Sequence, residues 1–267
     1  MAFDFSGRRV VITGAGRGIG RATARAFAEA GADLVLLGRS AASLEDARDE
    51  LRRAGNEITI EVCDVSQRPS VDAAIDATLR NKRRIDVLIN NAGVSGSAAP
   101  FLSLSEDAWD EMLAVNLKGP FLLSQRVAAA MAEAGGGVIL NNGSIAGLGV
   151  DGPFAHYSSS KAGLLALTRS MAVELAPFGI RVNSVSPGYT RTDMTTQYFG
   201  PEADEFLSKN FIRAPIRRIV EPGEIASTFL FLASEEASGI TGANVVVDGG
   251  LTSNLFIMET FPPGQGW

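Results

Sequence analysis

The chain has 267 residues, of which 46% are apolar and 20% charged, which is enough to bury a large core in one α/β domain. A net charge of −6 argues against a nucleic-acid-binding surface, and a single cysteine, Cys63, excludes an internal disulfide and suits a reducing compartment. We see neither the start of a secretory signal nor the ~18 apolar residues of a membrane span. We therefore expect a cytoplasmic protein of one domain, without nucleic-acid or membrane partners.

Short apolar runs alternate with longer amphipathic segments along the chain. Strands are predicted near residues 9–13, 33–38, 57–63, 85–89, 137–141, 179–185 and 243–247. Helices are predicted at about 18–30, 41–54, 68–82, 105–132, 155–175 and 222–234. Most strand runs are continuously apolar, so helices should cover both sheet faces. The pattern predicts a Rossmann-type, doubly wound, mainly parallel seven-stranded α/β sheet, with ligands at the C-terminal strand ends.

The first predicted strand opens into a glycine-rich turn, TGAGRGIG, which includes Arg17 and leads into a helix. Backbone N–H groups and the positive end of a helix dipole make such a turn an anion site, and glycines let a pyrophosphate approach closely. The GxGxxG spacing does not fit, because Ile19 stands where a glycine is needed. The spacing GxxxGxG does fit, through Gly14, Gly18 and Gly20.

A serine, a tyrosine and a lysine follow the fifth predicted strand. Ser144 stands 13 positions before Tyr157, and Lys161 follows the tyrosine by four, so Tyr157 and Lys161 share a helix face. A cation about 4 Å from a phenol, at an effective dielectric near 20, is worth roughly 4 kcal/mol, or about three pKa units before desolvation. Tyr157 can then act as a general base. An exposed helical pair is the alternative for YxxxK alone.

Together these motifs resemble the short-chain dehydrogenase/reductase family, from about Phe5 to Gly250. The further matches are Cys63-Asp64-Val65, Asn90-Asn91-Ala92-Gly93, Asn116 within AVNLKG, and Pro187-Gly188 followed by Thr190 and Thr192. The family also places its serine 13 positions before its tyrosine. The resemblance implies a catalytic domain at residues 1–250. Residues 251–267 form a tail that either covers the active site or a subunit interface, or is a frayed end.

The resemblance also implies a mechanism. Ser144 hydrogen-bonds the substrate oxygen, Tyr157 exchanges a proton with it, and hydride passes between the nicotinamide and the carbonyl carbon. Lys161 lowers the pKa of Tyr157 and binds the nicotinamide ribose. Asn116 holds a water that leads from Lys161 to solvent; a helix kink or a buried polar contact is the alternative for this residue. No metal is implied.

Further cofactor contacts follow from position in the family pattern. Asp64 should accept a hydrogen bond from the adenine amino group, beside an apolar wall at Val65. The other implied cofactor contacts are Gly14, Arg17, Gly18, Ile19, Gly20, Asn90, Asn91, Ala92, Gly93, Pro187, Gly188, Thr190 and Thr192.

The choice of dinucleotide depends on the end of the second strand. A carboxylate there would accept from the ribose 2′-hydroxyl of NAD, whereas the 2′-phosphate of NADP needs a cation. The sequence has Arg39 and Ser40 at this point, and Asp33 stands at the opposite end, some 15 Å away at ~3.3 Å per residue. Arg39 and Arg17 can bind a phosphate, so NADP(H) is predicted, with NAD(H) as the alternative.

The substrate is less well defined. The expected pocket is bounded by residues 94–101, 147–154 and 190–211, the last resembling the family's mobile lid; aromatic side chains at Tyr198, Phe199, Phe206 and Phe211 either line the pocket or pack the lid. Few charges line these segments. We expect a secondary alcohol or ketone. A 3-oxoacyl-thioester reductase, with a basic entrance at Arg213, Arg217 and Arg218, a sugar or polyol dehydrogenase using NAD, and a non-catalytic nucleotide sensor are the alternatives.

Two further expectations concern neighbouring surfaces. His156 is the only histidine, and adjacent helical positions differ by ~100°, so we expect it at the pocket rim or an interface, without a direct catalytic role. The family commonly forms dimers or tetramers through its long helices. A homotetramer or homodimer through 105–132 and 155–175 is therefore implied, although core packing also explains the alanine-rich faces.

Overall fold

The computed structural model describes residues 3–52, 56–80, 84–150 and 152–253. Its centre is one parallel sheet of seven strands in the order β3-β2-β1-β4-β5-β6-β7. The strands are β1 Arg9–Thr13, β2 Asp33–Gly38, β3 Ile58–Val62, β4 Val87–Asn90, β5 Gly137–Asn142, β6 Ile180–Pro187 and β7 Asn244–Val247. The order reverses between β1 and β4, and this switch point is where such sheets bind ligands.

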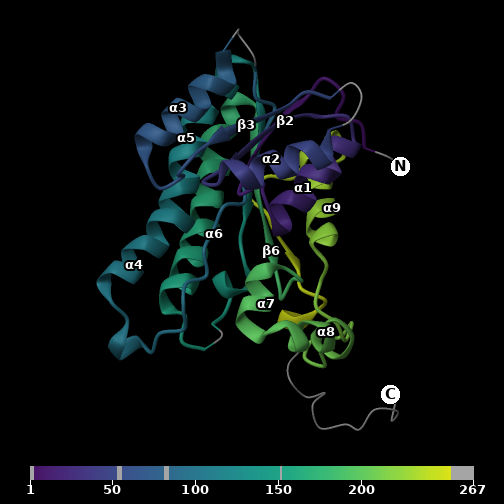
Figure 1. The fold of residues 1–267 in the computed structure, drawn as a ribbon. Helices are drawn as coiled ribbons and strands as arrows, with labels where there is room; N and C mark the ends of the chain where they lie inside the picture. Colours follow the sequence, from purple (N-terminus) through teal and green to yellow (C-terminus); the bar gives the residue numbers. More distant parts are fainter. Residues whose placement is uncertain (1–2, 53–55, 81–83, 151, 254–267) are drawn as a thin grey trace.

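Helices cover both faces of the sheet (Figure 1). They are α1 Gly18–Glu29, α2 Ala41–Leu51, α3 Arg68–Leu79, α4 Glu106–Leu113, α5 Gly119–Glu133, α6 Ala155–Leu175, α7 Asp193–Phe199, α8 Pro201–Asn210 and α9 Pro222–Ala233. Alternate residues of one strand enter different cores, because successive side chains point to opposite faces. Val10 and Ile12 pack with the side of α1 and α9, whereas Val11 packs with the side of α3 and α5. The predicted fold is confirmed.

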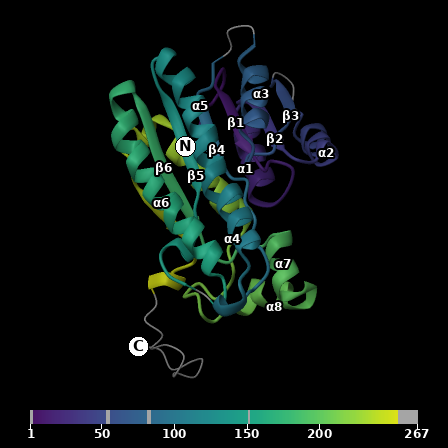
Figure 2. The same ribbon diagram turned by 90° about the vertical axis from the view of Figure 1, so that its left-hand side faces the viewer.

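The long helix predicted at residues 105–132 is interrupted. A π-helical turn, Ala114–Lys118, separates α4 from α5, and the three segments run alongside α6 (Figure 2). The side chain of Asn116, in this turn, bonds the main chain of Val94 in both directions, at 2.9 and 2.8 Å. Asn116 and Val94 are 22 positions apart in the sequence. The helical periodicity of residues 105–132 therefore could not predict this contact or the interruption of the helix.

The segment after β6 forms α7 and α8 at one end of the sheet (Figures 1 and 2). Within it, Phe211 is buried against Tyr189, with ring centroids 5.3 Å apart. The side chains of Tyr198, Phe199 and Phe206 lie outside the described residues, as do residues 254–267 of the tail. Among the described helices, none combines the length and the apolar character needed to cross a membrane.

Candidate active site

The glycine turn between β1 and α1 is shaped for an anion. Gly14 and Gly18 have φ values of +64° and +53°, and a Cβ on Gly20 would lie 2.2 Å from the Gly14 carbonyl oxygen. Arg17, the residue before the helix, makes no side-chain cap, and the first turn of α1 contains no acidic residue. The N-terminal N–H groups and the helix dipole are thus available to a phosphate. These features fit the pyrophosphate of a dinucleotide.

A chain of side-chain hydrogen bonds fixes the turn against the neighbouring strands. The Thr13 hydroxyl accepts from the backbone N–H groups of Asn91 and Ala92, both at 2.9 Å. The Asn91 amide donates to the carbonyls of Thr13 and Gly14, at 2.9 and 3.3 Å. The loop after β4 therefore lies directly under the glycine turn. A Cβ on Gly14 would be 3.0 Å from the Cα of Ala92.

The predicted serine, tyrosine and lysine come together at the end of β5. Ser144 is buried and caps a short 3-10 turn by accepting from the N–H of Ala146 at 3.1 Å. Tyr157 and Lys161 lie one turn apart in the first half of α6, and the ammonium stands over the tyrosine ring, 5.7 Å from its centroid. Lys161 is buried, and its ammonium donates to the carbonyl of Asn142 at 2.8 Å.

The pKa values of this group differ in part from expectation. Burial raises the pKa of Tyr157, and a hydrogen bond with Ser144 opposes the rise. Burial also lowers the pKa of Lys161 to about 8. The pKa of Tyr157 is therefore raised, whereas the sequence predicts that Lys161 lowers it; burial of the phenol is the largest cause of the difference. In this structure Tyr157 holds its proton at neutral pH, the form that a proton donor requires.

Asn116 joins the lysine side of the site to the loop after β4. It is 1% exposed, and its amide donates to Val94 and to the Ser160 hydroxyl, at 2.8 and 3.2 Å. A Cβ on Gly93 would lie 3.2 Å from its Oδ1 and 3.7 Å from the ammonium of Lys161. Asn116 therefore makes the buried polar contact that is the alternative to a water-holding role, and it does so from a π-helical turn.

The remaining predicted cofactor residues lie along the same strand ends. Thr192 faces the glycine turn, because a Cβ on Gly18 would be 3.4 Å from its methyl group. Thr190 is buried and donates to the carbonyl of Gly188 at 3.0 Å, just after Pro187 ends β6. The ends of β1 and β6 therefore lie on two sides of one site.

The residues predicted to bind adenosine lie near the end of β2 and after β3. Arg17 and Arg39 are exposed, and neither forms an ion pair with any carboxylate that the structure describes. Ser40 caps α2 by accepting from the Ser43 N–H at 3.3 Å. Asp64 accepts from the N–H and hydroxyl of Ser66 at 3.0 and 2.7 Å, a local turn that occupies one of its oxygens.

His156 is not at the rim. It is 1% exposed, burial lowers its pKa, and its ring lies parallel to that of Phe154 with centroids 6.4 Å apart. A Cβ on Gly96 would lie 2.9 Å from its Nε2, so the imidazole packs against the loop after β4. The expectation of a rim position is wrong, because the loop folds over this face of α6.

The basic residues considered for a carrier-binding entrance are partly neutralised. Arg218 forms a bidentate pair with Glu224, at 2.7 and 2.9 Å. Arg191, which lies outside the predicted entrance, pairs with Glu221 at 3.1 Å. In the described part of the chain, no three His, Cys, Asp or Glu side chains gather where they could hold a metal ion.

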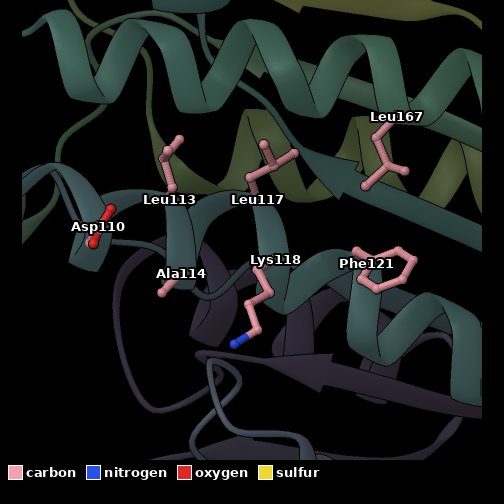
Figure 3. Close-up of a pocket in the computed structure, with 7 residues that line it drawn as sticks. All are labelled: Asp110, Leu113, Ala114, Leu117, Lys118, Phe121 and Leu167. Atoms are coloured by element: carbon pink, nitrogen blue, oxygen red, sulfur yellow. The ribbon is translucent and has the colours of Figure 1, made fainter.

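A separate groove of about 540 Å³ runs between α4, the π-helical turn, α5 and α6 (Figure 3). Its lining is mainly apolar: Asp110, Leu113, Ala114, Leu117, Lys118, Phe121 and Leu167. None of these residues belongs to the predicted catalytic group. The groove lies on the outer surface of the helices that the sequence analysis assigned to assembly.

Known proteins resemble this chain over most of its length. A family model described as "Enoyl-(Acyl carrier protein) reductase" matches residues 14–252. The cis-4-hydroxycyclohexanecarboxylate dehydrogenase of Sinomonas cyclohexanicum is 40% identical, over 95% of this chain and 100% of that protein. A short-chain type dehydrogenase/reductase from Mycobacterium marinum has a TM-score of 0.87 at 37% identity, over 95% of this chain and 98% of that one.

A second similar solved structure is a complex with two bound molecules. The 7α-hydroxysteroid dehydrogenase complexed with NADH and 7-oxoglycochenodeoxycholic acid has a TM-score of 0.86 at 34% identity, covering 93% of this chain and 96% of that one. Family model, relatives and solved structures therefore agree over nearly the whole chain. The chain belongs to the short-chain dehydrogenase/reductase family, and it is an oxidoreductase that acts on CH–OH groups with a nicotinamide dinucleotide.

Proposed function

We propose that the protein is an NADP(H)-dependent oxidoreductase that interconverts a secondary alcohol and a ketone. The observation that carries this proposal is the placement of Ser144, Tyr157 and Lys161 beside one another at the end of β5, next to the glycine turn. A bound dinucleotide supplies the hydride. A non-catalytic nucleotide sensor would have no need of this buried group.

The three side chains divide the work. Ser144 donates a hydrogen bond to the substrate oxygen and holds it beside Tyr157. Tyr157 gives its proton to that oxygen during reduction and takes one back during oxidation. Lys161 would hold the nicotinamide ribose of a bound dinucleotide, and its ammonium stabilises the phenolate left after proton transfer. Asn116, fixed between Val94 and Ser160, maintains the path by which the proton is replaced from solvent.

The charge distribution near the end of β2 supports NADP(H). Two exposed guanidinium groups, Arg39 and Arg17, flank the site where a 2′-phosphate would lie, and no carboxylate ends β2. Arg39 can donate two parallel hydrogen bonds to such a phosphate. Ser40 adds a hydroxyl at the beginning of α2. Asp64, with one oxygen occupied by Ser66, keeps the other for the adenine amino group, and Val65 provides the adjacent wall.

Lys161 should set the alkaline limit of the reaction. We expect the rate of ketone reduction to fall as pH rises through about 8, because the ammonium then loses its proton. The pKa of Tyr157 is raised, so the phenol is still protonated in this range. The pH profile of kcat/KM for reduction measures this limb. The guanidinium of the Lys161→Arg variant keeps its proton, so any residual activity of this variant should not fall above about pH 8. The same fall in that variant would contradict the assignment to Lys161.

Exposed apolar side chains favour an uncharged, hydrophobic substrate. Phe101 and Leu102, after β4, are 77% and 100% exposed, and Val150, after β5, is 83% exposed. The loops meet where the Ala99 N–H donates to the carbonyl of Pro153 at 2.9 Å. The ring named in one relative, a cis-4-hydroxycyclohexanecarboxylate dehydrogenase, supports a cyclic substrate. We rank a cyclic ketone above a sugar or polyol, and above a carrier thioester, since Arg218 is occupied by Glu224.

A substrate screen tests the proposed function. Cyclic and linear ketones, the matching secondary alcohols, a polyol and a 3-oxoacyl thioester should be assayed with NADPH and NADH in parallel. We expect the highest kcat/KM with a cyclic ketone and NADPH. Preferred turnover of the thioester, or of a polyol with NAD⁺, would replace this assignment by one of those alternatives. Tight dinucleotide binding without turnover of any member would favour a sensor.

We also propose a homodimer or homotetramer, with a second copy covering the groove of Figure 3. Phe121 is 42% exposed at this groove, and association would remove its ring from water. Phe121→Arg should therefore lower the molar mass measured by light scattering, from a dimer to the monomer or from a tetramer to the dimer. Val62→Arg, at the exposed edge strand β3, is the control that should leave the mass unchanged. An unchanged assembly in the Phe121 variant would exclude this face.

The domain assignment remains a proposal: residues 1–250 form the catalytic domain and 251–267 a tail over the site or a subunit interface. The last described segment, Leu251–Ser253, follows Asp248, whose carboxylate accepts from the N–H groups of Gly250 and Thr252 at 2.8 and 2.7 Å.

We propose a cytoplasmic location on the ground that the one thiol, Cys63, is free and buried.

A further inference from the structure

Asn142, the last residue of β5, occupies a junction that the mechanism above does not use. Its side-chain amide donates to the Oδ1 of Asn91 at 2.9 Å, and Asn91 in turn bonds the glycine turn. Its main-chain carbonyl accepts from the ammonium of Lys161 at 2.8 Å. The same residue is therefore joined to the dinucleotide-binding turn on one side and to the catalytic lysine on the other.

The orientation of the Asn142 amide follows from its partners. Two carbonyl oxygens, of Thr13 and Gly14, face one end of the Asn91 amide, and only its NH₂ group can donate to them. The Oδ1 of Asn91 must then face Asn142, so Asn142 has to present its own NH₂ group in return. The side-chain oxygen of Asn142 is thereby turned away from Asn91.

That oxygen is buried and has no donor among the described residues. A buried acceptor without a donor destabilises the folded chain, so such an atom at the edge of a binding site calls for an explanation. The Lys161 ammonium already donates to the main-chain oxygen of the same residue. A ligand with a hydroxyl or an amide N–H would satisfy the free oxygen.

The position in the sheet identifies which half of a dinucleotide could do so. Arg39 follows β2, and β5 lies three strands away in the order β2-β1-β4-β5. At ~4.8 Å between strands, the two points are about 14 Å apart. Asn142 also stands two residues before Ser144. It therefore belongs to the reacting half of the site rather than the adenosine half.

We propose that the Asn142 side-chain oxygen accepts a hydrogen bond from the nicotinamide riboside half of the bound dinucleotide. This inference rests on the proposed function. Asn142 then contributes to the affinity for the nicotinamide end of the dinucleotide. The hydrogen bond to this end satisfies the oxygen that has no donor within the described chain.

Binding measurements with a whole and a truncated ligand test it. Kd values for NADPH and for adenosine 2′,5′-bisphosphate, which lacks the nicotinamide riboside, are measured by calorimetry for the wild type and for Asn142→Leu. We expect NADPH binding to weaken about tenfold, as for a lost hydrogen bond, and bisphosphate binding to stay within about twofold. Asn142→Thr keeps a hydroxyl and suits a strand, so it should fold readily. Its Kd for NADPH should lie between those of the wild type and Asn142→Leu.

The controls separate this inference from the proposed function and from general instability. If the wild type binds neither NADPH nor NADH, the proposed function fails; if it binds NADH instead, the pair becomes NADH and AMP. Asn183→Thr changes a buried asparagine on β6 whose amide atoms are both satisfied, at 2.8 and 3.0 Å, and should not alter either Kd. Unchanged NADPH affinity in both Asn142 variants, or equal losses for the two ligands, would overturn the inference.

Discussion

Replacing Tyr157 by phenylalanine should reduce kcat by about 10² to 10⁴-fold, the usual contribution of a positioned proton donor. The change removes one oxygen from a side chain that is in contact with Ser144 and lies under the Lys161 ammonium. The ring itself remains, so the packing at the beginning of α6 should be preserved. Turnover of the best ketone and the Kd of NADPH, measured on the same preparation, provide the check.

A second tyrosine offers a matched control. Tyr189 packs edge-to-face on Phe211 and is not part of the proposed catalytic group. Tyr189→Phe removes the same atom near the same end of the sheet, and kcat should change far less than in the Tyr157 variant. If Tyr157→Phe keeps most of its turnover, another group donates the proton and the proposed mechanism is wrong.

Arg39→Asp should reverse the choice between the two dinucleotides. Loss of a charged hydrogen bond of roughly 1.5–3 kcal/mol would raise the KM of NADPH by about 10- to 100-fold. The new carboxylate also repels the 2′-phosphate but can accept from the 2′-hydroxyl of NADH. The KM of NADH should therefore fall. Initial rates with both dinucleotides, at a fixed ketone concentration, measure the ratio.

The control for Arg39 must carry the same change in net charge. Arg48 lies on α2, the helix that follows Arg39, and pairs only with Asp49 in the part of the chain described here. Arg48→Asp should leave the ratio of the two KM values unchanged. A wild type that already prefers NADH, with a preference unaltered by Arg39→Asp, would refute the assignment of NADP(H).

The fold was predictable because its strands are buried on both faces. The predicted limits of the first two strands, 9–13 and 33–38, coincide with β1 and β2. Leu34 and Leu36 enter one core and Val35 enters the other, so an unbroken apolar run is the expected signature of such a strand. Helices α7 and α8 carry no comparable signal, and the sequence analysis treated their residues only as a lid.

The site was predictable where spacing along one element is enough. Tyr157 and Lys161 are four residues apart on α6, and helical geometry alone places them on one face. The role of Asn142 could not be found in this way, because its partners Asn91 and Lys161 lie 51 and 19 positions away. Only the pairing of β4 with β5 brings the two asparagines together.

The pKa of Tyr157 shows a second limit of reasoning from spacing. The spacing predicts that a nearby cation lowers this pKa. Spacing alone, however, does not tell how deeply the phenol is buried. In the folded chain burial of the phenol is the largest influence on this pKa, and it raises the value. The burial of His156 was missed for a similar reason, since its cover comes from the loop after β4 rather than from α6 itself.

The crowding around Gly20 limits how this protein can be engineered. A Cβ there would lie 2.2 Å from one backbone oxygen and 2.5 Å from the Asn91 amide nitrogen, so even alanine would force the turn apart. A mutant library aimed at new cofactor use should therefore leave position 20 constant. Diversity belongs at the exposed positions 17 and 39, whose side chains make no ion pair with a described carboxylate.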